Sequence, residues 1–476
     1  MKVKIMKKEE ICYMPAYKMV NAIKNQEITS EEITETIIER IERINPIINA
    51  YCTPTFDLAR ELAKKSDDKV KKGEKLGPLN GIPTSIKDLN KTGGIRTTFG
   101  CIIFEDNVPI QDEFIVKKLK DAGIVLLGKT NSPAFGHKAV TDNKIFGETK
   151  NPWNREMTPG GSSGGAAAAV ASGLGPLAQG SDGGGSIRVP SCLCGVFGIK
   201  PSYGRVPRLW DKISFYRLSH NGPIARNVKD AALMLDIMAG SNDIDKYTLS
   251  TPELSYINVL QNVPKKIRIG YSLDLGYVKA IDSEVGSKVA ESVYNFEKLD
   301  WSVEEIKIKL KQAYRSFVTI LVAGLAYDYK KYLKDWKDKM DPTFVNLIES
   351  GLNITGLDLM HAELQSINYY NQLTEFFKSF DILVTPTTAV TAFKLGKMFP
   401  DKIDGRAVSP AGWMPFTFPF NLTGHPAASI PCGWSNEGLP IGMQIIGPRA
   451  NDRLVLQVSK AFEDLAPWQG KRPNFN

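Results

Sequence analysis

Residues 160–188 read GGSSGGAAAAVASGLGPLAQGSDGGGSIR, and the rest of the chain is organised around this stretch. After an opening Gly-Ser turn, the small residues from Ala166 to Ser172 predict a tightly packed helix. The apolar segment Leu174 to Ala178 predicts a buried strand, and a second Gly-Ser turn follows it. Two serines, Ser162 and Ser186, therefore lie on two glycine-rich turns that one packed unit joins.

The second turn has the composition that a nucleophilic serine requires. Gly183, Gly184 and Gly185 precede Ser186, and they permit positive φ and the close approach of a carbonyl group. The backbone N–H groups from Gly183 to Ser186 can then form an oxyanion hole. A flexible Gly/Ser linker and a phosphate-cradling loop are the alternative interpretations. The apolar runs disfavour a solvated linker, and the sequence lacks the pattern G-x-x-x-x-G-K-[ST].

The stretch resembles the signature of the amidase signature family of serine hydrolases. The match continues through Gly195 to Ser202 (GVFGIKPS) and Gly204 to Pro207 (GRVP). The resemblance implies a Ser-cisSer-Lys triad, with Ser186 as the nucleophile and Ser162, 24 residues earlier, as the bridging cis-serine. Two departures lie outside the triad: the family usually has threonine at Ser181, and many members have a larger residue at Gly183.

The lysine of the triad is assigned from the segment Gly81 to Asp88, which reads GIPTSIKD. Its alternation predicts a strand with Lys87 at its end. A lone lysine at a strand end is usually a solvated charge, but the family presents its catalytic lysine in the pattern G-x-P-x-x-x-K-D. Further along, Ile124 to Lys129 predicts a buried parallel strand. Similar enzymes line the site with the loop that follows, in which Asn131 and Gly136 are candidates for substrate binding or support.

A lysine is the expected base because no histidine occupies a recognisable position. The chain has four histidines, no G-x-S-x-G elbow, no H-E-x-x-H motif and no cluster of metal ligands, so neither a metal nor a cofactor is expected. Burial lowers the pKa of a lysine, and Ser162 can relay a proton because a hydroxyl both accepts and donates. Asp182 and Arg188 bracket the nucleophile turn and are expected to brace it, and Ser163 is a further support candidate.

Composition indicates an ordinary soluble protein. The 476 residues are 42% hydrophobic and 24% charged, with a net charge of +8. The lysines are scattered and no aromatic-basic module appears, so no nucleic-acid partner is expected. The cysteines lack zinc-type spacing and are few for the length, which favours a reduced intracellular setting. No apolar signal core is visible near the N-terminus, and the longest apolar run, around Phe317 to Ala326, is too short to span a bilayer. We expect a cytoplasmic protein that acts on a small-molecule amide, with no membrane partner and with a homodimer as one option.

The alternation of strands and helices predicts an α/β fold with helices on both faces of the sheet. Similar proteins form one α/β/α domain around a large mixed sheet, so we expect a single domain over residues 1–476. The signature core covers about 77–207, and two variable pocket segments cover about 208–225 and 310–420. Helices are expected at 17–24, 29–46, 56–72, 112–123, 227–239, 284–298, 312–337, 357–378 and 453–465. Other strands are expected at 47–52, 266–271, 381–385, 427–430 and 441–446.

The leading functional hypothesis is an amidase that converts R-CO-NH2 and water to an acid and ammonia through an acyl-enzyme on Ser186. The rival is the amidase-fold glutaminase subunit of a tRNA-dependent amidotransferase, and a non-catalytic binding protein is a third class. The rival usually has M-D-E-F where this chain has SPAF (132–135), and S-L-D-x-I-G-P where this chain has LSHNGP (218–223). Both departures favour a stand-alone amidase.

Aromatic residues in the two variable segments predict a preference for apolar or aryl monoamides over glutamine and asparagine. The alternative is that these aromatic side chains are simply core. They are Trp210, Phe215, Tyr216, Trp413, Phe416 and Phe418.

Overall fold

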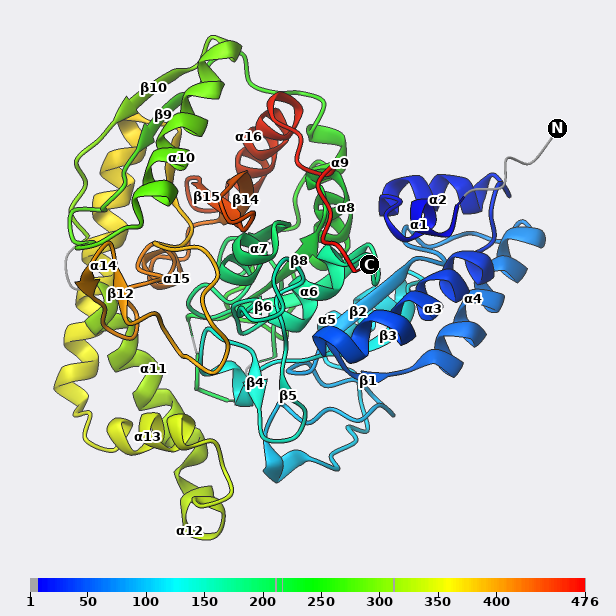
Figure 1. Ribbon diagram of the computed structural model, residues 1–476, viewed down its shortest axis with the longest axis horizontal. Coiled ribbons are helices and arrows are strands. Elements are labelled where there is room, and N and C mark those ends of the chain that lie inside the picture. Colours follow the sequence, from blue (N-terminus) through cyan, green and yellow to red (C-terminus); the bar gives the residue numbers. More distant parts are fainter. Residues whose placement is uncertain (1–6, 210–211, 216, 311–312, 476) are drawn as a thin grey trace.

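The computed structural model describes residues 7–209, 212–215, 217–310 and 313–475. Its centre is an 11-stranded sheet with the strand order β1-β3-β2-β6-β8-β7-β14-β15-β11-β9-β10 (Figure 1). The strands are β1 (Tyr51–Pro54), β2 (Pro83–Lys87), β3 (Val125–Thr130), β6 (Leu177–Asp182), β7 (Phe197–Lys200), β8 (His220–Ala225), β9 (Arg268–Tyr271), β10 (Ser302–Glu305), β11 (Ile382–Pro386), β14 (Ala427–Trp434) and β15 (Pro440–Ile446). Two small hairpins lie outside this sheet, β4 (Asp142–Asn143) with β5 (Gly147–Glu148) and β12 (Lys402–Ile403) with β13 (Arg406–Ala407).

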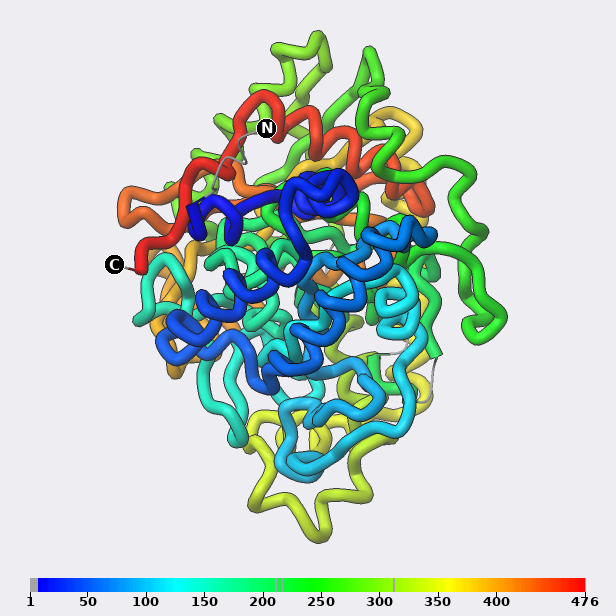
Figure 2. The backbone as a smooth tube through the Cα atoms, turned by 90° about the vertical axis from the view of Figure 1, so that its right-hand side faces the viewer, coloured from blue at the N-terminus to red at the C-terminus, as the bar shows by residue number. Residues whose placement is uncertain are grey.

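Helices surround the sheet, and the N-terminal helices α1 to α4 lie together on the side that faces the viewer in Figure 2. The α-helices are α1 (Lys8–Cys12), α2 (Ala16–Lys24), α3 (Ser30–Ile48), α4 (Phe56–Lys71), α5 (Phe114–Asp121), α6 (Gly164–Ala171), α7 (Arg188–Cys194), α8 (Val228–Met238), α9 (Tyr256–Val259), α10 (Ser283–Val293), α11 (Ala313–Tyr329), α12 (Leu333–Trp336), α13 (Pro342–Gly351), α14 (Gly356–Ser379), α15 (Pro419–Leu422) and α16 (Asp452–Leu465). Short 3-10 helices occupy Ile102–Phe104, Ala134–Gly136, Tyr294–Leu299 and Lys330–Tyr332.

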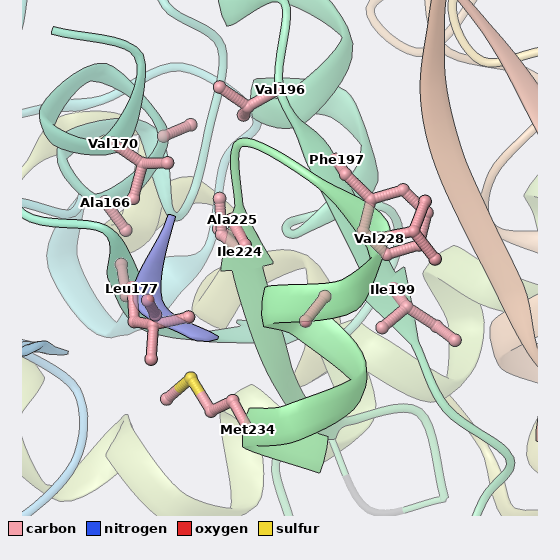
Figure 3. Close-up of a cluster of buried hydrophobic side chains, with 14 of the residues drawn as sticks. Ala166, Val170, Leu177, Val196, Phe197, Ile199, Ile224, Ala225, Val228 and Met234 are labelled. Atoms are coloured by element: carbon pink, nitrogen blue, oxygen red, sulfur yellow. The ribbon is translucent and has the colours of Figure 1, made fainter. Parts of the chain in front are cut away.

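The sheet is mixed and is covered on both faces. β2 pairs in parallel with β3 and β6, whereas β8 pairs antiparallel with β6 and β7. Successive residues of a strand point to opposite faces, and in β11 Ile382 and Val384 join one apolar cluster while Leu383 joins the other. Figure 3 shows part of the first cluster, where Ala166 and Val170 of α6 lie near Leu177 of β6. The predicted fold class is therefore confirmed.

Most predicted elements are present, and the differences have local causes. Only residues 51 and 52 of the predicted strand 47–52 lie in a strand. α3 continues past Pro46 to the fully buried Ile48, so that β1 begins only at Tyr51. The predicted helix 312–337 is present as three successive helical pieces. α11 ends at Tyr329, whose ring packs against Phe135 and Phe344, and the 3-10 helix Lys330–Tyr332 and α12 continue the segment to Trp336.

The predicted strand Leu174 to Ala178 also differs from the structure. β6 begins at Leu177 and continues to Asp182, since each of its residues pairs with β8. Ser181 and Asp182 are consequently strand residues, and the second turn begins at Gly183.

Two neighbouring parallel strands position the candidate site. Lys87 is the last residue of β2 and Asp182 is the last residue of β6. Because these strands are parallel neighbours, their carboxyl ends lie at the same edge of the sheet. This is the edge at which open α/β sheets commonly bind ligands.

Candidate active site

Lys87 lies at the end of β2 with its side-chain nitrogen, Nζ, between two serine hydroxyls. Its Nζ is 2.7 Å from Ser162 Oγ and 3.1 Å from Ser181 Oγ, and the side chain is fully buried. Burial holds the pKa of Lys87 well below its usual range. The Asp182 carboxylate opposes this shift and the Arg208 guanidinium adds to it. A neutral amine in contact with a hydroxyl can accept a proton from it.

The first glycine-rich turn carries Ser162 between the sheet and α6. The peptide bond between Gly161 and Ser162 is cis, as the resemblance implies. Ser163 connects this turn to the second one: its N–H donates to the carbonyl oxygen of Ser186 (3.1 Å), and its hydroxyl donates to the carbonyl oxygen of Ser181 (3.2 Å). Ser163 therefore fixes the spacing between the two turns.

The loop after β3 approaches Ser162 through Gly136. A Cβ atom on Gly136 would lie 3.0 Å from Ser162 Oγ, and its φ of +71° favours glycine. Asn131 is fully buried and braces the same loop, because its side chain bonds Thr149 Oγ1 (3.1 Å) and Asn143 Nδ2 (2.7 Å). These hydrogen bonds give Asn131 a role in ordering the loop.

The second turn, Gly183 to Ser186, links β6 to α7. Ser186 is half-buried between fully buried neighbours. The N–H groups of Gly183, Gly184 and Ser186 have no hydrogen-bond acceptor among the described residues. Gly185 differs from the other glycines of the turn, because its N–H donates to Asp182 Oδ1 (2.7 Å). Its N–H is therefore engaged inside the turn, which does not fit the oxyanion role expected from the sequence.

Asp182 and Arg188 form a fully buried ion pair behind this turn. Arg188 donates from Nε and Nη2 to the two carboxylate oxygens at 3.0 and 2.9 Å, and Asp182 also accepts the N–H of Ile187 (3.1 Å). Burial alone would raise the pKa of Asp182, but the Arg188 guanidinium outweighs it and holds that pKa well below its usual range. The carboxylate is therefore ionised, and it orders the turn from within.

Four polar contacts of the site were missed by sequence reasoning. Ser181 was noted only as a departure from the family pattern, although its hydroxyl contacts Lys87. Asn421 donates to Asp182 Oδ1 (2.9 Å), Gln444 accepts from Arg188 (2.6 Å), and Thr417 donates to the carbonyl oxygen of Gly184 (2.7 Å). Only Asn421 had a signal, since the segment from Phe420 to Pro426 (FNLTGHP) also resembles the family.

The predicted pocket aromatics separate into different environments. Phe215 packs against Gly183, because a Cβ there would lie 2.5 Å from the ring. The aromatic residues Trp413, Phe416 and Phe418 are fully buried core residues. Trp210 and Tyr216 lie outside the described residues. A phenylalanine that sequence reasoning missed, Phe317 of α11, packs against Gly184 in the same way.

No histidine of the described residues hydrogen-bonds Lys87, Ser162 or Ser186. His137 bonds Ala134 and Thr343, and His220 bonds the carbonyl oxygen of Leu218. A Ser-His pair is therefore not the catalytic unit that this geometry offers.

Comparison with known proteins identifies the family. The family model described as Amidase matches residues 32–456. The chain belongs to the amidase family. An acylamidase of Rhodococcus erythropolis is 37% identical over 98% of both chains. A component of the glutamyl-tRNA(Gln) amidotransferase of Moorella thermoacetica is 33% identical over 98% of this chain and 99% of its own. The crystal structure of a bacterial aryl acylamidase of the amidase signature family superposes with a TM-score of 0.91 at 31% identity, covering 96% of this chain and 97% of the other.

The predicted family and the predicted amidase activity are both confirmed by these relatives. Within the described ranges of this amidase, no helix has the length and apolar character needed to cross a membrane.

Proposed function

We propose that this amidase hydrolyses a carboxylic acid amide to the acid and ammonia through an acyl-enzyme on Ser186. The observation that carries the proposal is the 2.7 Å contact between the buried Lys87 Nζ and Ser162 Oγ beside the Gly183–Ser186 turn. A hydroxyl already bonded to a neutral amine is a proton relay, and the serine on the neighbouring turn is the group that needs one.

Acylation follows from these roles. Ser186 Oγ attacks the amide carbon and loses its proton to Ser162, which passes its own proton to Lys87. The tetrahedral intermediate then collapses, and the proton returns from Lys87 through Ser162 to the leaving nitrogen, which departs as ammonia. Water attacks the resulting ester by the same proton path and releases the acid.

We assign the oxyanion hole to the N–H groups of Gly183, Gly184 and Ser186. These donors come from one turn, and Asp182 fixes its shape through the N–H groups of Gly185 and Ile187. Donors that are held in place before the reaction need no reorganisation when charge develops on the oxygen. Gly185 has a structural role in this arrangement.

The substrate class that we propose is an apolar or aryl monoamide. Phe215 and Phe317 both pack against the turn that carries Ser186, and the acylamidase of R. erythropolis is similar over the whole chain. The alternative is the glutaminase component of a tRNA-dependent amidotransferase, since the M. thermoacetica relative is also similar from end to end.

The test is a panel of acetamide, hexanamide, benzamide, asparagine and glutamine, assayed for ammonia release with the purified chain alone. We expect higher kcat/KM on hexanamide and benzamide than on glutamine. A rate on glutamine above that on every apolar amide would support the amidotransferase alternative. Ser186→Ala and Lys87→Ala should abolish turnover, while Ser162→Ala should slow acylation less completely.

A further inference from the structure

One face of α11 lies against the nucleophile turn and against the chain segment that precedes it. Phe317, Gly324 and Asp328 are spaced i, i+7 and i+11, which places them on a single face of the helix. α11 packs beside α13 and α14 at one end of the molecule (Figure 1).

Phe317 forms a fixed aromatic wall at Gly184. A Cβ atom on Gly184 would lie 2.5 Å from Phe317 Cζ, so the ring is in direct contact with the turn. The same ring stacks on Phe418, with ring centroids 5.5 Å apart and an interplanar angle of 23°. Phe418 is fully buried and Phe317 is 8% exposed, so the stack anchors Phe317 in the core beside the turn.

Phe215 forms a second wall at Gly183, and α11 holds it in place. The N–H groups of Ile213 and Ser214 donate to the Asp328 carboxylate at 3.2 and 2.6 Å. At Gly324 the same backbone touches the helix, because a Cβ there would lie 2.9 Å from Ser214 Cα. Phe215 follows directly with a φ of +59°, and its ring lies 2.5 Å from where a Cβ on Gly183 would be.

We propose that Phe317 and Phe215 are specificity-determining residues whose rings bound a slot for a flat acyl group, and that Asp328 is the positioning residue for Phe215. The inference rests on the proposed function, because the acyl group reaches the slot only when its carbonyl carbon is bonded to Ser186. An aromatic acyl group bonded to Ser186 beside these two rings would gain aromatic pairing with them, which a saturated ring of the same size cannot make. The preferred substrates are therefore amides of flat aromatic acids.

The experiment compares benzamide with cyclohexanecarboxamide, which match in size and differ in flatness. The measured quantity is kcat/KM for benzamide divided by kcat/KM for cyclohexanecarboxamide. This ratio is determined for the wild type and for Phe317→Ala, Phe215→Ala, Asp328→Ala and Asp328→Asn. A contact between aromatic rings is worth ~0.5–1.5 kcal/mol, or about two- to twelvefold. We expect each Phe→Ala replacement to lower the ratio by that factor, mainly through KM for benzamide.

The two Asp328 variants show whether this residue positions Phe215 or only stabilises the fold, because only a positioning role changes the ratio of the two amides. Asp328→Ala should lower the ratio as Phe215→Ala does, and Asp328→Asn, which keeps one acceptor oxygen, should be intermediate. Phe114→Ala on α5 is the matched control and should leave the ratio unchanged. An unchanged ratio in both Phe→Ala variants that still turn over would overturn the proposal, as would equal losses on both amides.

Failure of the proposed function would look different. If Ser186→Ala retained hydrolysis of both amides, the acyl-enzyme assignment would be wrong whatever the ratios were. If Ser186→Ala were inactive and the ratios did not move, only the slot would be wrong.

Discussion

Replacement of Arg188 by methionine tests the buried ion pair that shapes the nucleophile turn. Methionine keeps much of the side-chain volume but removes the guanidinium. Asp182 then stays buried with its backbone and Asn421 partners, and the basic groups left near it are Lys87 and Lys200, whose pKa values burial holds well below the usual range. Both side chains of the pair are 0% exposed, and breaking such a pair by removing one partner costs about 3–5 kcal/mol. We expect the free energy of unfolding at pH 7 to fall by this amount.

Arg60→Met provides the matched control. Arg60 pairs with Glu35 at 2.8 Å, but the two side chains are 45% and 47% exposed, and exposed pairs contribute only about 0–1 kcal/mol. Urea unfolding of the three proteins, followed by intrinsic fluorescence, gives the comparison. If Arg188→Met lost no more than Arg60→Met, the energetic reasoning about the pair would be refuted.

The contribution of Asp182 to stability should change with pH in opposite directions in the wild type and in Arg188→Met. In the wild type the pKa of Asp182 is held below its unfolded value, so the pair's contribution is fully present above pH ~4 and is lost as pH falls through the folded pKa. In Arg188→Met, burial remains without the cation and raises that pKa. The folded variant then binds more protons than its unfolded state, so its stability falls as pH rises. The difference in the free energy of unfolding between the wild type and Arg188→Met should therefore widen from pH ~4 to pH ~7. Adding Asp182→Asn should recover part of the loss, because no buried charge remains.

Lys87→Met should remove the acid limb of the kcat/KM profile together with nearly all activity. Lys87→Met should also have a higher free energy of unfolding than the wild type at neutral pH, because the wild-type lysine must lose its proton when the protein folds. This difference in free energy should narrow as pH rises toward ~10.4, where the unfolded lysine also loses its proton. Gly136→Ala should lower kcat, since its Cβ would lie 3.0 Å from Ser162 Oγ. Gly73→Ala, at a φ of +62° with no atom within 4 Å, should show only the backbone cost of about 1–2 kcal/mol in thermal unfolding. Ser181→Ala should lower kcat/KM by about two- to twelvefold, the value of one hydrogen bond of ~0.5–1.5 kcal/mol, and a loss as large as that of Ser162→Ala would contradict the secondary role given to Ser181.

Local patterns in the sequence were sufficient to predict the local backbone structure around Lys87 and Ser186. The alternation before Lys87 correctly predicted a strand that ends at this residue, and the glycines before Ser186 correctly predicted a tight turn. The neighbouring Asp88 accepts a hydrogen bond from the Thr98 hydroxyl rather than from Lys87, in keeping with the alternation of side chains along a strand. Strand ends and turns can be predicted from a few neighbouring residues because those residues determine the local backbone geometry.

Contacts between distant segments could not be predicted in this way. Thr417 accepts a hydrogen bond from Arg188 across 229 residues, and no local pattern marks such a partner. A helix over 312–337 was predicted around Phe317, but a helical pattern does not say which turn a ring on that helix will contact. Gly185 was counted as an oxyanion donor because composition alone does not show where an N–H points.

Covalent labelling shows whether Ser186 is the nucleophile of this amidase. A fluorophosphonate should add its mass once per chain, and peptide mapping should place it on the peptide that carries Ser186. We expect Ser186→Ala to take up no label and Lys87→Met to take it up far more slowly than the wild type. Label on another serine, with Ser186 unmodified and activity lost, would show that Ser186 is not the nucleophile.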